Sequence, residues 1–551
     1  MKKLSRTQRV GAFFAPAALL AGVILAGCSA ATADTQSGTA GGSLTYLEHQ
    51  TFNTLYAPDG GFYPNGGVIN NVTDRLLYQN PETLELEPWI ATELPEVNDD
   101  ATEYTFKLRE GVTYSDGTPL DAENVVKNFD LYGKGDPDRK LNVSEAINNY
   151  DRGEVIDDHT VKFYFTAPSP GFAQAVSTIN SGLLSNETLD RDSDGFGPGN
   201  AVEIIGSGPF VVADEKVGTE LTLVAREDYN WAPASRDHQG RAHLDEVKYI
   251  VTPEDSVRIG SLLAGQADIA RQVEAQDEEQ VTAAGLTLVA APTNGVTNGL
   301  SFRIQHPVLE DIRVRQAISA GIDREDILDT LFTDSYPLAT SVVASTAQGY
   351  ADQSALIPDY DPEAAAALLA EAGWKPGADG VLEKDGQRLS LTFNEALPQP
   401  RSKEVVTKIQ EQLAPLGVEV KLNPGDQAAQ TAAAADVNTI QVYHSMVGRA
   451  DHDVIKSQFY STNRNTLLNY DVESGTVADP KLEELLEKVA STPDAEGRTA
   501  ASQDAQKYLI EQSYFLPLFE EPQIFGVQTY VDGFKTESIG RPSFYDVQLN
   551  K

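Results

Sequence analysis

The sequence contains a single cysteine, Cys28, among its 551 residues. One cysteine cannot form an intramolecular disulfide, so the chain is not a disulfide-stabilised secreted scaffold. Basic residues are scarce as well, because 42 Lys and Arg face 82 Asp and Glu and leave a formal net charge of −40. Binding to nucleic acid needs clustered Lys and Arg, so this charge balance disfavours a nucleic-acid partner.

Sequence motifs typical of common enzymes are also missing. The chain has no His-Glu-x-x-His metalloprotease phrase, no Gly-x-Ser-x-Gly elbow and no phosphate-cradling loop. We therefore expect a protein that is not an enzyme and that needs no cofactor. A secreted hydrolase stays open as an alternative, since a glycosidase requires only a pair of carboxylates and the chain is rich in them.

Only one long apolar run is present, and it lies at the N-terminus. Four basic residues within the first nine positions precede an uncharged, Ala- and Leu-rich run from Gly11 to Ala26. A cationic head, an apolar middle and small residues before a cleavage site are typical of an export signal. A membrane-spanning helix, the alternative, needs about 20 apolar residues. We predict a signal peptide over residues 1–27.

The end of this run, Leu25-Ala26-Gly27-Cys28, resembles the lipobox of bacterial lipoproteins. That resemblance implies cleavage before Cys28 and lipidation of its sulfur. Stable anchoring needs more than one acyl chain. Residues 28–42, rich in Ala, Thr, Ser and Gly, are then a lipidated, flexible tether. We expect the folded body to stand at the extracytoplasmic face of a bacterial cell membrane.

Strand and helix signals alternate along the rest of the chain, which favours an α/β fold. Alternating apolar residues predict strands at 104–108, 161–165 and 247–251, and Leu84 and Leu86 are assigned to an edge strand. Capping aspartates predict helices after Asp121, Asp323 and Asp361. The Ala-rich run 428–435 stays ambiguous.

Six phrases of this sequence, in this order, resemble the extracytoplasmic solute-binding proteins of family 5, the peptide/nickel type that serves ABC importers. They span nearly the whole mature chain, and most of them are structural signatures. The phrases are Arg109–Val125, Gly206–Phe210, Gly265–Ile269, Asp311–Arg324, Tyr360–Trp374 and Phe515–Phe519.

The resemblance implies a periplasmic-binding-protein-like fold with two lobes, a ligand cleft between them and a subdomain inserted in lobe I. The expected boundaries are 43–75, 196–295 and 515–551 for lobe I, 76–195 for the inserted subdomain and 296–514 for lobe II. The implied function is that of an ABC importer's substrate-binding component, which closes around an oligopeptide or similar small solute and delivers it to the permease. We expect a monomer.

The resemblance also selects a candidate ligand anchor, Asp451. In peptide-binding members an Asp within a Trp-x-Ala-Asp-like phrase, followed by Asp-Pro, pairs with the ligand's α-amino group. The matching stretch keeps Ala450-Asp451 and Asp453 but lacks the Trp and the Pro. A turn or helix-capping role is the alternative for Asp451. Arg449 is a candidate for binding a carboxylate of the ligand. The alternative is that its side chain is simply solvated at the protein surface.

Further candidate ligand-binding residues are Tyr443 and His444 before Asp451, and Tyr63 in lobe I. Tyr63 belongs to an aromatic group near a Gly-rich passage, for which core packing is the competing explanation. His444 and His452 also permit a metal or haem interpretation, but no spacing matches a dedicated metal loop, so no metal site is predicted. The other aromatic candidates are Phe52, Tyr56 and Phe62.

Two further functions keep the same fold. The cleft could bind a metal chelate, an oligosaccharide or another organic solute in place of a peptide. The protein could also act as an extracytoplasmic sensor. Peptide recognition through backbone hydrogen bonds leaves little trace in a sequence, so the residues do not select among these ligands.

Overall fold

Three main β-sheets organise the chain, and two of them combine strands that lie far apart in the sequence. The computed structural model describes residues 41–397, 399–461, 463, 467–471 and 474–551. All of these residues belong to one compact unit. The signal peptide and Cys28 lie outside the described residues, as does all of the predicted tether except Gly41 and Gly42.

The seven-stranded sheet, called the first sheet, has the strand order β12-β23-β11-β1-β10-β9-β8. Its central strand β1 pairs in parallel with β10 and β11, and the other neighbours are antiparallel. The strands are β1 (Ser43–Glu48), β8 (Phe210–Lys216), β9 (Glu220–Ala225), β10 (Glu246–Val251), β11 (Ile269–Arg271), β12 (Thr287–Ala291) and β23 (Gln523–Val527).

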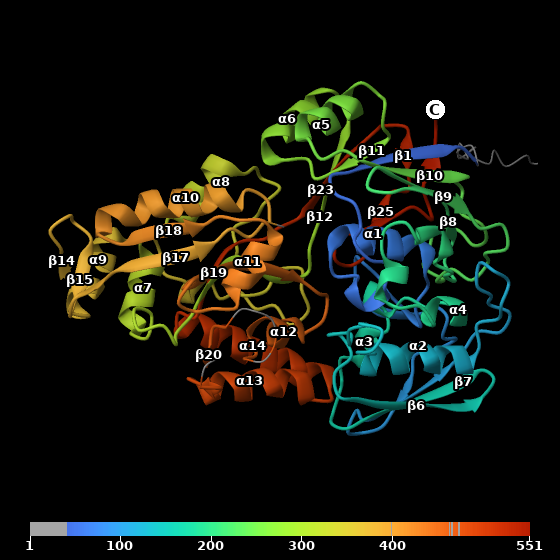
Figure 1. Ribbon diagram of the computed structural model, residues 1–551, viewed down its shortest axis with the longest axis horizontal. Helices are drawn as coiled ribbons and strands as arrows, with labels where there is room; N and C mark the ends of the chain where they lie inside the picture. The colour runs from blue at the N-terminus through green and yellow to red at the C-terminus, as the bar shows by residue number, and fades with distance from the viewer. Residues whose placement is uncertain (1–40, 398, 462, 464–466, 472–473) are drawn as a thin grey trace, which may run out of the picture. The chain divides into compact units, whose positions relative to one another are not determined.

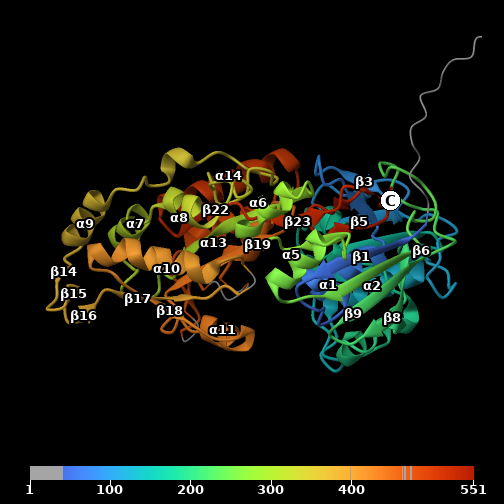
Figure 2. The same cartoon turned by 90° about the horizontal axis from the view of Figure 1, so that it is seen from above.

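The five-stranded sheet, called the second sheet, has the order β18-β17-β19-β13-β22. Every residue of β13 is buried. Helix α10 packs along β18 (Figures 1 and 2). The strands are β13 (Gly295–Phe302), β17 (Ser390–Asn394), β18 (Glu419–Asn423), β19 (Val442–Gly448) and β22 (Phe515–Phe519).

The chain crosses between the two sheets twice, at residues 292–294 and at residues 520–522. Strands β12 and β23 pair in the first sheet, and their continuations β13 and β22 pair in the second. The two crossings therefore connect neighbouring strands of the first sheet to neighbouring strands of the second and lie side by side. A hinge between two lobes requires this arrangement. Because β22 belongs to the second sheet, we move the proposed start of the last lobe I segment from residue 515 to residue 520.

A four-stranded sheet, β4-β5-β7-β6, lies within the predicted inserted subdomain. Helix α2 packs against β6 and β7, as Figure 1 shows. Phe163 is central to the aromatic core, with its ring centroid 4.9 Å from Phe129 and 5.4 Å from Phe172. The strands are β4 (Glu96–Val97), β5 (Glu103–Lys107), β6 (Tyr150–Asp157) and β7 (Thr160–Phe165).

Helices begin where the capping residues predict them. The carboxylates of Asp121, Asp323 and Asp361 accept hydrogen bonds from backbone amides three residues later. The α-helices are α1 (Tyr63–Val72), α2 (Ala122–Lys134), α3 (Phe172–Ala175), α4 (Asn186–Leu189), α5 (Asp255–Leu263), α6 (Ala275–Ala283), α7 (Ile312–Ala320), α8 (Arg324–Leu331), α9 (Pro362–Glu371), α10 (Ser402–Leu413), α11 (Gln427–Ala434), α12 (Val454–Phe459), α13 (Pro480–Ser491) and α14 (Ala495–Glu511).

The remaining strands form small two- and three-stranded pairings at the edges of the lobes. Leu84, predicted in an edge strand with Leu86, instead lies in the turn before β3, where its φ of 58° is left-handed. These strands are β2 (Leu77–Gln79), β3 (Leu86–Pro88), β14 (Lys375–Pro376), β15 (Leu382–Lys384), β16 (Gln387–Arg388), β20 (Tyr470–Asp471), β21 (Thr476–Val477), β24 (Val531–Asp532), β25 (Lys535–Thr536), β26 (Pro542–Ser543) and β27 (Gln548–Leu549).

No helix within the described part of the chain combines the length and the apolar character needed to cross a bilayer.

Candidate ligand-binding site

Four of the five predicted site residues lie in or just after β19: Tyr443 and His444 in the strand, and Arg449 and Asp451 in the loop that follows it. At the end of this strand the backbone amide of Arg449 donates to the carbonyl of Asn294, in the first crossing, at 2.7 Å. The next carbonyl, of Ala450, accepts from Gln79 Nε2 of β2 at 3.0 Å. Ala450 is also buried against Leu84 and Ile539. The loop after β19 is therefore held by the crossing and by elements of the first lobe together.

Two adjacent cavities lie beside this loop, with volumes of about 190 and 140 Å³. Both are lined by residues between 145 and 172 on one side and by residues between 449 and 491 on the other, and they share Asn148, Asp453 and Lys456. The larger cavity is lined by Glu145, Asn148, Arg449, Asp453, Lys456, Ser457 and Asn463. The smaller is lined by Ala146, Asn148, Asn149, Ala167, Pro168, Ser169, Gly171, Phe172, Asp453, Lys456, Glu487, Ala490 and Ser491.

A third cavity, inside the first lobe beside Arg75 and Trp89, measures about 20 Å³. This space holds one water-sized molecule and is too small for a solute. The two cavities at the subdomain boundary are therefore the candidate ligand-binding site.

A buried ion-pair cluster lies beside this site, and of its members only Asp453 lines the cavities. The guanidinium of Arg498, in the first turn of α14, donates to both carboxylate oxygens of Asp451 at 3.1 and 2.7 Å. It also donates to Asp453 Oδ1 at 2.7 Å. Burial alone would raise the pKa of Asp451, but Arg498 outweighs this effect and holds that pKa below its ordinary value. For Asp453, burial prevails and raises the pKa.

Asp451, the predicted amino anchor, is thus already engaged. Its side chain is 3% exposed, and Oδ2 accepts a further bond from the backbone amide of Asp453 at 2.9 Å. Asp451 does not line either cavity. Its role as the contact for a ligand's ammonium group stays a prediction.

Arg449 is half-buried and lines the larger cavity, as the prediction of a ligand contact requires. Lys456, which the sequence analysis did not select, lines both cavities and donates to Glu487 Oε2 at 3.0 Å. It lies five residues after Asp451, just beyond the matching stretch, and that proximity was the only signal for it.

His444 lies inside the second sheet, away from the cavities. Its Nε2 bonds the side-chain oxygen of Asn298 at 2.6 Å, and its Nδ1 bonds the hydroxyl of Ser402 at 2.9 Å. Burial lowers the pKa of His444 to about 4, so the ring is neutral at physiological pH. Because an amide oxygen can only accept, Nε2 carries the proton and Nδ1 accepts from Ser402.

Tyr443, on the opposite face of β19, is half-buried, and the guanidinium of Arg303 lies 5.3 Å from its ring centre. His452 bonds the hydroxyl of Thr499 through Nε2 at 3.0 Å. No group of three or more His, Cys, Asp or Glu able to hold a metal ion occurs among the described residues.

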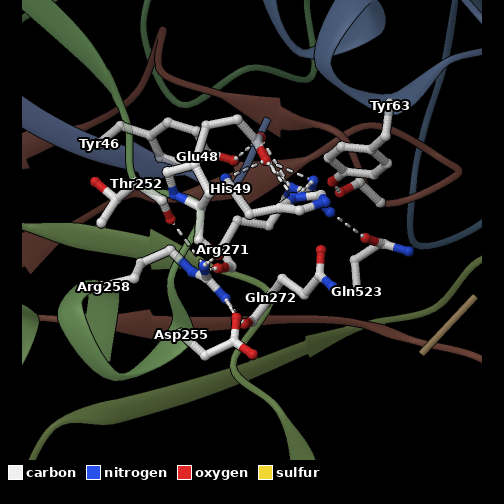
Figure 3. A network of polar contacts seen from close by, with 12 residues as sticks. Tyr46, Glu48, His49, Tyr63, Thr252, Asp255, Arg258, Arg271, Gln272 and Gln523 are labelled. Carbon is white, nitrogen blue, oxygen red and sulfur yellow. Dashed lines mark hydrogen bonds and ion pairs between the residues drawn. The ribbon is translucent and has the colours of Figure 1, made fainter. Parts of the chain in front are cut away.

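Tyr63 is the first residue of α1 and lies in the first lobe. The guanidinium of Arg271 lies 4.0 Å from its ring centre (Figure 3). Its hydroxyl donates to the carbonyl of Gly540, and the guanidinium of Arg541 lies 5.4 Å from the ring centre. Tyr63 therefore belongs to a polar network of the first lobe and does not line either cavity. Of the other aromatic candidates, Phe52 and Tyr56 are buried in the first-lobe core and Phe62 is half-buried.

The arrangement defines a class of protein: a two-lobed α/β binding protein with a double crossing between lobes and a polar cavity where they meet. A family model described as bacterial extracellular solute-binding proteins, family 5, matches residues 85–466. The chain belongs to this family. Its members are binding proteins, not enzymes, and act outside the cytoplasm.

Two curated relatives illustrate the family. The oligopeptide-binding protein AppA of Bacillus subtilis is 26% identical over 385 residues, which cover 68% of this chain and 67% of AppA. The dipeptide-binding protein of Escherichia coli is 26% identical over 529 residues, which cover 90% of this chain and 92% of the relative.

Solved structures share the fold. NikA from Brucella suis, in complex with Fe(III)-EDTA, superposes with a TM-score of 0.76 at 22% identity and covers 92% of this chain and 100% of its own. AppA from Bacillus subtilis, in complex with a nonapeptide, gives a TM-score of 0.74 at 22% identity, with coverage of 94% and 100%.

Proposed function

We propose that this protein captures an oligopeptide or a similar small solute between its lobes and delivers it to the permease of an ABC importer. The observation that carries the proposal is the pair of polar cavities lined by the inserted subdomain on one side and by lobe II on the other. The relatives named for oligopeptide and dipeptide binding support the choice of ligand.

The mechanism follows from the two crossings. A ligand that contacts both lobes stabilises the closed arrangement by the contacts that exist only in that arrangement. Closure then rotates the lobes about residues 292–294 and 520–522, and the permease recognises the closed form. No reaction step is needed, because the solute is handed over unchanged.

The test of this proposal begins with the protein lacking residues 1–28, purified from the cell. Native mass spectrometry of the fresh protein is expected to reveal a bound peptide mixture, and small-angle scattering to show a more compact particle with ligand than after its removal. A single bound metal chelate would replace the peptide assignment by the chelate alternative. Identical scattering profiles with and without the bound solute would contradict the closure mechanism.

We further propose that Cys28 carries a lipid anchor. The lipobox-like tetrad before it and the flexible composition of residues 29–42 support this assignment. The anchored protein acts as a monomer beside the permease. Size-exclusion chromatography with light scattering on the soluble form tests the monomer, and a mass near twice that of one chain would contradict it.

Replacing Cys28 by Ser is expected to move the protein from the membrane fraction to the soluble or secreted fraction, because no acyl chain can then be attached. Cell fractionation with immunoblotting measures this shift. The neighbouring substitution Ser29→Ala is the matched control and should leave the protein at the membrane. Retention of Cys28→Ser protein at the membrane would contradict the anchor.

A further inference from the structure

Leu84, in the turn between β2 and β3, has an unfavourable backbone conformation for a leucine. Its φ of 58° is left-handed, a region that a residue with a Cβ enters at a cost in free energy. The turn is closed by its own backbone, because the amide of Leu84 donates to the carbonyl of Asn80 at 2.8 Å and the amide of Asn80 donates to the carbonyl of Glu85 at 2.9 Å. A residue kept in this conformation needs contacts elsewhere that offset the cost.

Both the carbonyl and the side chain of Leu84 contact distant segments of the chain. The carbonyl accepts a hydrogen bond from Gln348 Nε2 at 3.1 Å. The side chain is 7% exposed and packs against Ala450, in the loop after β19, and against Ile539. These three apolar residues form a small cluster that is separate from the two large hydrophobic cores. The turn therefore makes an apolar contact outside both cores.

The bond between Gln348 and Leu84 links elements of the two large sheets. Strand β2, which leads into the turn, shares a hydrophobic core with β1 of the first sheet. Gln348 precedes Gly349 and Tyr350, whose carbonyls accept from glutamines of α14 at 2.7 and 3.2 Å. Helix α14 in turn packs against β22 of the second sheet. The contact of the turn with Gln348 therefore crosses from one lobe to the other.

A buried glutamine, Gln79, makes a second connection of this kind. It is the last residue of β2 and is 4% exposed. Its Nε2 donates to the carbonyls of Leu84 at 3.2 Å and Ala450 at 3.0 Å. Its Oε1 accepts from Gln174 Nε2 at 3.1 Å and from Ser538 Oγ at 2.9 Å. All four hydrogen-bonding positions of the amide are used, so the side chain of Gln79 is fixed where it joins Leu84 to Ala450.

These contacts lie between the first crossing and the two cavities. In the loop after β19, the amide of Arg449 bonds the first crossing and the carbonyl of Ala450 bonds Gln79. Three residues further along, Asp453 lines both cavities. A rotation about the crossings that opens the cavities must therefore separate Ala450 from the turn. The contacts involve only groups of the chain itself, so they can form before a solute binds.

We propose that Leu84, Gln79 and Gln348 form a latch that keeps a fraction of the molecules closed before the solute arrives. None of the three lines either cavity, so the latch acts on the lobes and not on the solute. It strengthens binding indirectly, because the apparent dissociation constant falls as the fraction of binding-competent molecules rises. The inference rests on the hinge closure of the proposed function, but not on the identity of the solute.

The experiment measures the separation of the lobes by pulsed electron paramagnetic resonance, without any solute. The protein spanning residues 29–551 contains no cysteine, so spin labels can be attached at Ile156→Cys and Glu484→Cys. Ile156, on β6, is 51% exposed, and the Glu484 side chain, on α13, is 73% exposed. After dialysis to remove bound solute, this labelled parent is expected to show two distances, and the shorter should be the one that the structure gives for these positions.

Two variants remove different parts of the latch. Gln348→Leu removes the hydrogen bond to Leu84, and Leu84→Gly removes the apolar contact while it still allows the left-handed turn. Each should lower the ratio of short to long distances by about two- to ten-fold. Gln503→Leu is the matched control, because Gln503 is also half-buried and donates Nε2 to the carbonyl of Tyr350 at 3.2 Å, but within one lobe. It should leave the ratio unchanged.

Three outcomes overturn the latch. The labelled parent shows no short distance, both latch variants keep the parent's ratio, or Gln503→Leu lowers the ratio as much as Gln348→Leu does. Failure of the proposed function gives a different result. If native mass spectrometry finds no bound solute, a lowered ratio in the latch variants still supports the latch. If a bound peptide is found while the ratio stays unchanged in both variants, the binding function stands without the latch.

Discussion

Replacement of Arg271 by Met is expected to lower the free energy of unfolding by about 3–5 kcal/mol, because it leaves the carboxylate of Glu48 buried without its partner. The Glu48 and Arg271 side chains are 6% and 4% exposed. Arg271 Nε donates to both carboxylate oxygens at 2.9 and 2.8 Å, and Nη2 bonds Oε1 at 2.5 Å (Figure 3). Glu48 is the last residue of β1 and Arg271 is the last residue of β11. These neighbouring strands end beside the second crossing.

The ionised state of Glu48 is what makes this loss large. Burial alone would raise the pKa of Glu48, but Arg271 and then His49 lower it to about 2. A carboxyl with a lowered pKa contributes stability above its ordinary pKa of 4.5, and this contribution is lost as the pH falls toward 2. The difference between wild type and Arg271→Met should therefore be largest near neutral pH and shrink in acid.

Urea unfolding at pH 7 and pH 3, followed by circular dichroism, measures this prediction. The double substitution of Glu48→Gln with Arg271→Met removes the buried charge as well as its partner and should regain most of the lost stability. As a surface control, Arg152→Met removes an exposed ion pair with Asp151 and should change stability by no more than about 1 kcal/mol. Equal unfolding midpoints for Arg271→Met and wild type would show that the pair contributes nothing.

Features of the fold that depend on local chemistry could be predicted from the sequence. The caps at Asp121, Asp323 and Asp361 involve amides only three residues away, so the residue order already contains both partners. The Ala-rich run that became α11 stayed ambiguous, since alanine favours helix but provides no apolar face to orient it. Leu84 was misassigned because its left-handed turn has no glycine to mark it.

The site depends on contacts between distant segments, and these could be predicted only in part. Arg449 and Asp451 were selected because they lie in one contiguous phrase that resembles a family signature. Arg498, which pairs with Asp451, lies 47 positions away and no local pattern links the two. The lining residue Asn148 comes from the inserted subdomain, and only the folded chain places it opposite lobe II.

The sequence also did not show which side chains of β19 are buried and which are exposed. Alternation predicts that Tyr443 and His444 face opposite sides of the sheet, but it does not tell which side is the interior. The structure buries His444 completely against Asn298 and Ser402 and leaves Tyr443 half-exposed. A buried, neutral histidine with both ring nitrogens bonded has a structural explanation that the sequence could not distinguish from a ligand contact.

Replacement of Glu521 by Gln is expected to stabilise the protein by about 2–5 kcal/mol at pH 8 and above. Glu521 lies in the second crossing, is 6% exposed and accepts a bond from Asn298 Nδ2 at 3.0 Å. Burial raises its pKa from 4.5 to about 8, and the nearby Glu274 adds to that shift. The carboxyl is therefore protonated in the folded protein over a range where the unfolded chain carries it ionised.

The sign of the pH dependence follows from this difference. Below about pH 4.5 both states hold the proton and Glu521 imposes no penalty on folding. As the pH rises toward 8 the unfolded state releases its proton while the folded state keeps it, so the free energy of unfolding falls throughout that window. Glutamine keeps the size of the side chain and an oxygen that can accept from Asn298, but it has no proton to release.

Thermal unfolding of both proteins between pH 4 and pH 9 tests this argument. The melting temperatures of wild type and Glu521→Gln should lie close together at the acid end and separate as the pH rises, with the variant higher. Glu484→Gln, whose carboxylate on α13 is 73% exposed, is the control and should show no such divergence. If the melting temperatures of wild type and Glu521→Gln changed with pH in parallel, the prediction would be contradicted. The carboxylate of Glu521 would then be hydrated, and the second crossing would be more open to solvent than its buried surroundings indicate.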